Sequence, residues 1–386
     1  MGAGAPVYLD YNATTPVDPA VGARIGEVLA ERFGNPSAAH AYGRQAREAI
    51  ETARAEVAAL LGAQAGEIVF TSGATEANNM AILGAARALR DRGRHLVTSA
   101  VEHPSVMEAM HQLQDEGWML TVLPVDADGR VDPGTVAGAL RPDTVLVSVM
   151  HANNEVGTVQ PIEEIGAVTR RHGVLLHVDA AQSVGKIPVS VETLGADLLT
   201  VAGHKFYAPK GIGALYVRAG VDLQPIVFGA SQEQGRRPGT ENVPYIAGLG
   251  VAAALARVRL PAEGSALRAL RDRLHRLLQE AIPGLTLNGH PGQRLPGTLN
   301  VSFPGVDARA LLAAAAADVA ASVGAACHAH GQEVSGVLAA MGVAPQRALG
   351  AVRLSVGRFT QTAAIERAAA ALIAAYRQQQ GATRRG

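Results

Sequence analysis

The stretch VLLHVDAAQSVGKIPVSVETLGADLLTVAGHKFYAPKGIGALYVR (residues 174–218) contains three short apolar runs separated by polar turns. The runs 174–179, 197–202 and 213–218 are rich in Val and Leu and are bounded by turn residues, which is typical of buried strands. Four similar runs precede them and bring the expected number of strands to seven: 67–70, 95–99, 120–125 and 144–150.

Segments with helical spacing lie between several of these runs, for example Glu76–Arg90 and Ile162–His172. Strands separated by helices predict βαβ units and a mainly parallel sheet that is covered on both faces. We therefore expect an α/β fold, with the seven-stranded sheet in a large domain that spans residues 15–256.

The pattern changes after Thr240. A long helical pattern over Leu249–Leu278 leads into a turn region rich in Gly and Pro. Strand patterns at 300–303 and 352–359 and helix patterns at 310–319 and 363–379 follow it. We expect these elements to form a smaller α+β domain, residues 257–386, which the N-terminal segment 1–14 joins.

Composition and charge narrow the class of protein. The 34 basic and 34 acidic residues balance, so no net charge attracts nucleic acid or an anionic membrane. The N-terminus lacks the basic region, apolar run and cleavage site of a signal peptide. The apolar stretch 310–327 is mostly alanine and too weakly hydrophobic for a membrane span. We expect a cytoplasmic protein that binds neither nucleic acid nor a membrane.

A turn rich in Ser, Gly and Thr separates a strand from a helix in FTSGATEANNMAI (70–82). The backbone N–H groups at a helix start, together with the helix dipole, bind a phosphate well. Capping of the helix by Ser72 or Thr75 is the alternative explanation of the same residues.

An acid, Asp179, ends the apolar run 174–179. Ligand sites in open α/β sheets lie beyond the carboxyl ends of the strands. An acid there can keep a ring nitrogen protonated, which a pyridine needs in order to act as an electron sink. Asp is also a common turn residue after a strand, so this feature alone is weak.

A lysine, Lys205, follows the run 197–202 and lies next to His204. The chain has only three lysines, so lysine-dependent chemistry has few candidates. Partial burial favours the deprotonated amine that forms a Schiff base. Lys186 opens a surface-like turn and Lys210 lies in a Pro-Lys-Gly turn, so both fit this role less well, and a solvated loop lysine is the alternative for Lys205.

The phosphate turn, the acid and the lysine occur together and in this order, which predicts pyridoxal 5′-phosphate (PLP) bound to Lys205. The chain resembles the class V, fold-type I PLP enzymes, and most closely the cysteine desulfurases and selenocysteine lyases. The resemblance covers nearly the whole chain through these motifs: YLDYNATTP (8–16), FGNPS (33–37), FTSGATE (70–76), EH (102–103), NNE (153–155), HVDAAQ (177–182), GHKFY (203–207), RPGTEN (237–242), GAAC (324–327) and VRLSVGRFT (352–360).

The resemblance implies a role for each matching residue. Lys205 would form the Schiff base, and His103 would stack on the ring and help to move protons. Asp179 would contact the ring nitrogen of the cofactor, and Gln182 would contact its ring hydroxyl. The phosphate would be held by Ala74, Thr75 and His204. Thr240 would reach the phosphate of the partner subunit in a homodimer. Asn154, beside the cofactor, and Arg353 would hold the substrate carboxylate. The chain departs from the desulfurases at Ala202, where they commonly have Ser, which removes one hydroxyl donor to the phosphate.

The single cysteine, Cys327, excludes an internal disulfide. A free cysteine is often an inert buried residue, but the polar residues after Cys327 indicate an exposed loop. His328 and His330 could favour its nucleophilic thiolate, whereas all three together supply too few ligands for a zinc site, so we expect no metal. The resemblance implies that Cys327 accepts sulfur from L-cysteine, or selenium from L-selenocysteine, with L-alanine as product and a persulfide or released selenide.

Which element is removed stays open in the sequence. The run ASVGAACH (321–328) is more like that of selenocysteine lyases, whereas cysteine is the more abundant substrate, and we expect a desulfurase-type enzyme able to use both. Such an enzyme would pass sulfur or selenium to an acceptor protein, as in iron–sulfur cluster assembly. The alternatives are another class V enzyme without a cysteine relay, such as an aminotransferase or β-lyase, and a non-catalytic sulfur-carrier protein.

Overall fold

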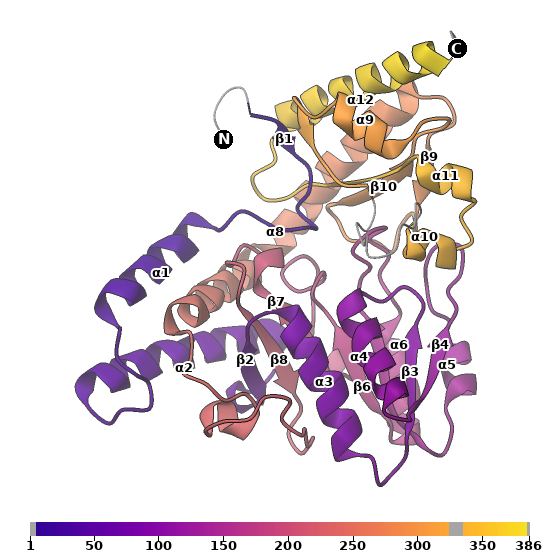
Figure 1. The fold of residues 1–386 in the computed structure, drawn as a ribbon. Helices are drawn as coiled ribbons and strands as arrows, with labels where there is room; N and C mark the ends of the chain where they lie inside the picture. The colour runs from indigo at the N-terminus through magenta and orange to yellow at the C-terminus, as the bar shows by residue number, and fades with distance from the viewer. Residues whose placement is uncertain (1–4, 324–334, 384–386) are drawn as a thin grey trace.

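The computed structural model describes residues 5–323 and 335–383 (Figure 1). A seven-stranded sheet has the strand order β2-β8-β7-β6-β5-β3-β4. Its strands are β2 (Ile68–Thr71), β3 (His95–Ser99), β4 (Met119–Leu123), β5 (Thr144–Met150), β6 (Leu175–Asp179), β7 (Leu198–Ala202) and β8 (Gly213–Val217). All pairs are parallel except those of β8, which is antiparallel to both β2 and β7. The predicted mainly parallel seven-stranded sheet is confirmed.

Burial explains why these segments form strands. Every residue of β5, β7 and β8 is buried, so both faces of the sheet are covered. In β2, Ile68 and Phe70 belong to one hydrophobic core and Val69 to another, as the alternation of side chains in a strand requires. The connections between strands contain α3 (Ala74–Ala88), α4 (Pro104–Asp115), α5 (Pro133–Ala139), α6 (Ile162–His172) and α7 (Val191–Leu194).

Three further helices surround the sheet: α1 (Pro19–Glu31), α2 (Ala41–Leu61) and the long α8 (Val243–Ala281). The first half of α8, up to Ala256, belongs to a core of the large sheet, and Leu267 and later residues belong to the core of a second, smaller sheet. The predicted domain boundary at 256–257 falls inside this continuous helix and stays a prediction. Among the described residues, α8 is the one helix long and apolar enough to span a membrane, and half of its most apolar window is buried within the protein.

The smaller sheet is antiparallel and has the order β12-β10-β9. Its strands and the helices around it are β9 (Thr286–Asn288), β10 (Thr298–Ser302), β12 (Ala351–Ser355), α9 (Ala308–Ala314), α10 (Gly336–Ala340), α11 (Pro345–Leu349) and α12 (Thr362–Thr383). This part lies at the top of Figure 1, and α8 runs into it from the large sheet. The predicted smaller α+β part of the fold is therefore confirmed.

The helix predicted over 310–319 is wrong at its C-terminal end. Helix α9 ends at Ala314, and Val319–Ala320 form strand β11, which pairs in parallel with β1 (Val7–Tyr8). The alanine-rich sequence favours helix locally, but the backbone of β1 supplies hydrogen bonds and Val319 becomes buried. Tertiary pairing overrides propensity here.

The N-terminal segment runs from the smaller sheet to the end of β7. The backbone N–H of Asn12 donates to Ser355 Oγ of β12 (2.9 Å), and the N–H of Thr15 donates to the carbonyl of His204 (2.9 Å). Because these two contacts lie only three residues apart in the chain, the segment places Asn12 and Ala13 directly beside the residues that follow β7.

A buried ion pair fixes the loop before α8. Arg54 of α2 donates to both carboxylate oxygens of Glu233, each at 2.8 Å, and the N–H of Phe70 also donates to Glu233 (2.9 Å). Both charged residues are less than 10% exposed. Glu233 has a left-handed backbone (φ 47°), which the ion pair holds in place. This loop precedes Thr240 and is anchored to the edge strand β2.

We expect Arg54→Met to destabilise the protein by roughly 3–5 kcal/mol, because Glu233 would stay buried without its cation. Urea denaturation of the wild type and the variant measures the loss. Arg257→Met is the matched control, since Arg257 forms an exposed 3.3 Å pair with Glu56, and its effect should stay within about 0.5 kcal/mol. Equal effects of the two substitutions would contradict the assigned role of the Arg54–Glu233 pair.

Candidate active site

A cavity of about 840 Å³ lies beyond the carboxyl ends of β5, β6 and β7, where the smaller sheet approaches the large one. The predicted site residues that line it are Ala74, Thr75, His103, Asn154, Asp179, Gln182, His204, Lys205 and Arg353. Thr240 is exposed and does not line this cavity. Cys327 lies outside the described residues. The structure thus brings nine residues from separate motifs to one cavity.

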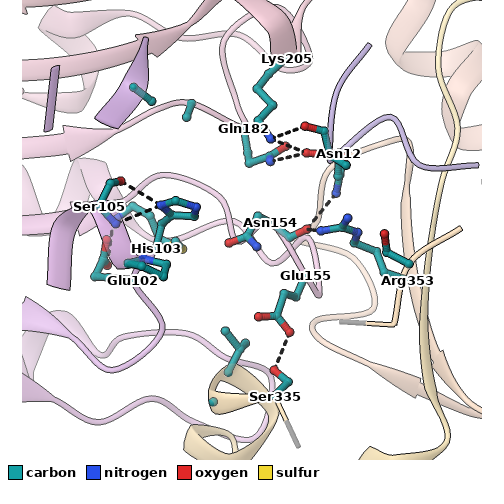
Figure 2. A pocket seen from close by; sticks show the side chains of 18 of the residues that line it. Asn12, Glu102, His103, Ser105, Asn154, Glu155, Gln182, Lys205, Ser335 and Arg353 are labelled. Atoms are coloured by element: carbon teal, nitrogen blue, oxygen red, sulfur yellow. Dashed lines mark hydrogen bonds between the residues drawn. The ribbon is translucent and has the colours of Figure 1, made fainter. Parts of the chain in front are cut away.

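Lys205 lies in a short 3₁₀ turn, Gly203–Lys205, directly after β7. Its Nζ donates to the carbonyl oxygens of Asn12 (2.7 Å) and Ala13 (2.8 Å) (Figure 2). Burial and, to a smaller extent, the nearby Arg353 cation lower the pKa of Lys205 to about 8, against the smaller opposing effects of Asp10 and Asp179. Roughly a tenth of the amine is therefore deprotonated and nucleophilic at pH 7.

Asp179 ends β6 and is buried with its carboxylate oriented by two donors. Its Oδ1 accepts from the N–H of Ala181 (2.9 Å), and its Oδ2 accepts from Asn78 Nδ2 (2.9 Å). Asn78 is a fully buried residue of α3, and its own Oδ1 has no protein partner. The carboxylate is held at the cavity wall and keeps lone pairs for a further donor.

His103 precedes α4 and faces the cavity as its N-cap residue. Its Nδ1 accepts from the N–H of Ser105 (3.1 Å) and lies 2.8 Å from Ser105 Oγ (Figure 2). Because Nδ1 accepts from a backbone N–H, which can only donate, the proton of the neutral ring is assigned to Nε2. Desolvation lowers the pKa of His103, and the Lys205 cation adds to this effect while Asp179 opposes it.

The first turn of α3 directs backbone N–H groups to the cavity wall. Its N-cap residue is Gly73, which provides no capping side chain, so the N–H groups of this turn stay available. Gly73 has φ 151°, and a Cβ on the neighbouring Gly213 would lie 2.8 Å from the Gly73 Cα, so the turn depends on both glycines. His204 completes this side of the cavity. Burial lowers its pKa to about 4, so the ring is neutral at physiological pH.

Arg353 of β12 has its guanidinium at the opposite side of the cavity. Its Nη2 donates to Asp10 Oδ1 (2.8 Å), its Nη1 donates to the backbone carbonyl of Asn154 (3.1 Å), and its Nε is buried without a protein partner. Asp10 also accepts from Ser322 Oγ (2.9 Å). A carboxylate in the cavity can therefore approach a guanidinium whose charge is already partly balanced.

Sequence reasoning missed Asn12 and misplaced Lys186. Asn12 is 3% exposed, and its carbonyl accepts from both Lys205 Nζ and Gln182 Nε2 (2.9 Å). The prediction that Lys186 lies in a surface-like turn is wrong, because its Nζ donates to Gln182 Oε1 (2.7 Å) and Asn12 Oδ1 (3.2 Å). Asn12 belongs to the quoted motif YLDYNATTP, so its position in that motif was the signal that could have indicated it.

A second missed residue, Glu102, is buried at the cavity wall beside His103. Its Oε1 accepts from Ser99 Oγ and from the N–H of Met150 (2.9 Å), and its Oε2 has no protein partner. Burial raises the pKa of Glu102 to about 8, with a smaller contribution from Asp179. The acid of Glu102 is therefore mostly neutral at pH 7.

Comparison with known proteins identifies the family of this chain. The profile of the family described as aminotransferase class-V matches residues 7–368. The chain belongs to the class V aminotransferase family. The cysteine desulfurase IscS of Anaeromyxobacter dehalogenans (strain 2CP-C) is 50% identical over 358 residues, which are 92% of this chain and 88% of that protein.

Two solved structures also match. A NifS-like protein has a TM-score of 0.90 and 36% identity, covering 96% of this chain and 98% of that one. The structure titled SspA in complex with cysteine has a TM-score of 0.82 and 38% identity, covering 90% and 98%. The family and the fold-type I architecture predicted from the motifs are confirmed. As a member of the class V family, this protein is a PLP-dependent enzyme.

The residues of this class V enzyme fit PLP. The uncapped first turn of α3 suits the phosphate, the carboxylate of Asp179 suits a protonated ring nitrogen, and the amine of Lys205 suits the aldehyde carbon. No group of three His, Cys, Asp or Glu side chains within 5–323 and 335–383 is arranged to hold a metal ion. The proposed Cys327, His328 and His330 lie outside these ranges.

We expect Lys205 in the cofactor-free enzyme to react with acetic anhydride with a midpoint near pH 8, as its lowered pKa requires. The neutral amine is the reactive form, so acetylation rises as the pH passes through the pKa, whereas an unperturbed lysine has a pKa of about 10.4. Peptide mass spectrometry across neutral and alkaline pH measures this, with a short unstructured lysine peptide as the control. A midpoint for Lys205 at or above that of the peptide would contradict the assignment.

Proposed function

We propose that this enzyme is a cysteine desulfurase that converts L-cysteine to L-alanine, with transfer of the sulfur to Cys327 as a persulfide, and that it also accepts L-selenocysteine. One observation carries the proposal: Lys205 and Arg353 line the same cavity. Val323 and Ser335, the residues directly before and after the segment that contains Cys327, line it as well. The relative named cysteine desulfurase and the solved complex with cysteine support this substrate.

Arg353 and Asn154 would hold the substrate carboxylate. Two N–H groups of a guanidinium match a carboxylate in geometry and charge, and this pairing orients the amino acid with its α-carbon towards Lys205. Asp10 Oδ1 accepts a 2.8 Å hydrogen bond from Nη2 at one edge of the Arg353 guanidinium, and this bond orients the guanidinium. The carboxylate would bind next to this pair, where Nη1 and Nη2 each carry a second N–H group.

Lys205 and His103 would move the protons. When bound, PLP supplies an electron sink that stabilises negative charge at the substrate α-carbon. Lys205 can accept the proton from that carbon, because burial keeps its pKa near the working pH. His103 would hold its proton at Nε2 and donate it at the substrate, while Ser105 and Asn78 fix the ring.

Cys327 would accept the sulfur. Its thiolate attacks the substrate sulfur, a sulfur–sulfur bond forms, the carbon–sulfur bond breaks, and the electron pair of the broken bond stays with the carbon, which is then protonated. Val323 and Ser335, on the two sides of segment 324–334, both line the cavity. Ser335, the residue that follows this segment, donates to Glu155 at the cavity (Figure 2).

Alanine formation from L-cysteine and L-selenocysteine, measured in parallel, tests the proposal. We expect Lys205→Ala to lower both rates by roughly 10³-fold or more. Cys327→Ala should abolish the reaction with L-cysteine and leave part of the reaction with L-selenocysteine, because a selenol ionises more readily than a thiol.

Two outcomes favour the alternatives. Sulfide release from L-cysteine that survives Cys327→Ala indicates a class V β-lyase or aminotransferase without a cysteine relay. A colourless purified protein that forms no alanine indicates a sulfur carrier. Retained turnover of Lys205→Ala with full cofactor occupancy contradicts the assigned role of Lys205.

We further propose a cytoplasmic homodimer in which Thr240 contacts the phosphate in the partner's site, and which delivers sulfur to an acceptor protein for iron–sulfur cluster assembly. Thr240 is exposed and lies outside its own cavity, and the preceding loop is fixed by the Arg54–Glu233 pair. The name IscS of the relatives supports the assembly role.

Mixed dimers of one Lys205→Ala chain and one Thr240→Ala chain test this arrangement. If Thr240 acts across the interface, one of the two sites receives both an intact Lys205 and an intact Thr240. We then expect about half of the wild-type activity, because one site of two is complete. Mixed dimers no more active than the two parent variants would show that Thr240 acts within its own chain.

A further inference from the structure

Lys186, Gln182 and Asn12 form a closed ring of hydrogen bonds beside Lys205. Lys186 Nζ donates to Gln182 Oε1 (2.7 Å) and to Asn12 Oδ1 (3.2 Å). Gln182 Nε2 donates to the backbone carbonyl of Asn12 (2.9 Å), the same carbonyl that accepts from Lys205 Nζ. Figure 2 shows Gln182 and Lys205 meeting at Asn12.

The ring allows only one orientation of the Gln182 amide. A backbone carbonyl accepts and never donates, and the Nζ of Lys186 directs its hydrogens to Gln182 Oε1 and Asn12 Oδ1. The amide oxygen must therefore face Lys186, and the amide nitrogen must face the carbonyl of Asn12. A flipped amide would set its oxygen against the carbonyl oxygen of Asn12 and would leave Lys186 without its acceptor on Gln182. Each mismatch leaves polar groups unpaired, which is costly at a mostly buried position.

The backbone places Lys186 here through Gly185. Gly185 has φ 75°, and a Cβ at this position would lie 2.6 Å from the Cβ of Phe206. The absence of a side chain lets the turn 180–187 pack against the residue that follows Lys205. Lys186 is thereby turned inward, four residues after Gln182, and burial together with the Lys205 and Arg353 cations lowers its pKa well below the usual value.

We propose that Lys186 is a positioning residue that holds the Gln182 amide with its nitrogen towards the cavity, where the second N–H can donate to the ring oxygen of the cofactor. The proposal rests on the proposed cofactor-binding role of Gln182. One hydrogen of Gln182 Nε2 is used by Asn12, and the other is free to point into the cavity that Gln182 lines. Without Lys186 the amide oxygen loses its donor and only the Asn12 carbonyl opposes a flip, so the orientation that presents the oxygen becomes more populated.

The orientation of Gln182 changes a measurable property of the bound cofactor. A donor at the ring oxygen stabilises the negative charge there, so that oxygen holds the proton of the neighbouring lysine linkage less strongly. Loss of the donor therefore raises the pH at which this proton dissociates. The dissociation shifts the visible absorbance of the cofactor, so its midpoint pH can be titrated in the resting enzyme without any turnover.

The test compares titrations of four purified holoenzymes with that of the wild type: Lys186→Met, Gln182→Ala, the double variant, and Lys210→Met as the control. We expect Lys186→Met to raise the midpoint by about one unit. Lys210→Met, which also removes a cavity-lining lysine but no bond to Gln182, should leave it unchanged. In the double variant the midpoint should equal that of Gln182→Ala alone, because Lys186 acts through Gln182.

Two results would overturn the proposal: a wild-type midpoint in Lys186→Met, or an effect of Lys186→Met that adds fully to that of Gln182→Ala. Circular dichroism checks the fold, and Lys186→Leu is the second variant if Lys186→Met does not fold. Loss of the fold in both variants also overturns the proposal, since Lys186 would then be structural. A wild type without visible absorbance, or visible absorbance retained in Lys205→Ala, instead refutes the proposed function itself.

Discussion

The amine of Lys205 is buried against two backbone carbonyls and no carboxylate, and the rest of the site depends on this choice of partner. A carboxylate at 2.7 Å would hold the amine as a cation, whereas the carbonyls of Asn12 and Ala13 orient it and leave its pKa near 8. The acidic side chains at this cavity have other partners or are neutral. Asp179 is oriented by Asn78, Asp10 is paired with Arg353, and Glu102 is mostly neutral.

This arrangement makes the N-terminal segment a part of the active site. Asn12 is bonded to Ser355 of the smaller sheet, to Thr298 of β10, and to the lysine and glutamine that follow strands of the large sheet. The residues that orient Lys205 are therefore bonded directly to the sheet that carries Arg353. The guanidinium of Arg353 and the amine of Lys205 are thus joined by a short path of hydrogen bonds through Asn12, which fixes the distance between the two groups.

Sequence patterns located the cavity residues whose side chains follow the ends of strands. Lys205 and Asp179 follow apolar runs whose boundaries were correct within a residue or two, so their position at one edge of the sheet followed from parallel topology. The positions that failed depend on contacts between distant segments. Asn12 acts largely through its carbonyl, which every residue possesses, and Lys186 is turned inward by the left-handed Gly185. The helix expected over 310–319 was cut short because β1 pairs with Val319–Ala320.

Asp10 has a consequence for the selection of substrates. It accepts a hydrogen bond from one edge of the Arg353 guanidinium in the absence of any ligand. It also accepts one from Ser322, which lies one residue before Val323, where the described chain reaches the segment with Cys327. An amine that lacks a carboxylate has no group that can replace or join Asp10 at Arg353. The Arg353 cation would therefore stay paired with Asp10. If Arg353 binds the substrate carboxylate as proposed, Asp10 is an internal anion that competes with the amino acid for the same cation, and a thiol amine without a carboxylate would gain no binding energy from Arg353.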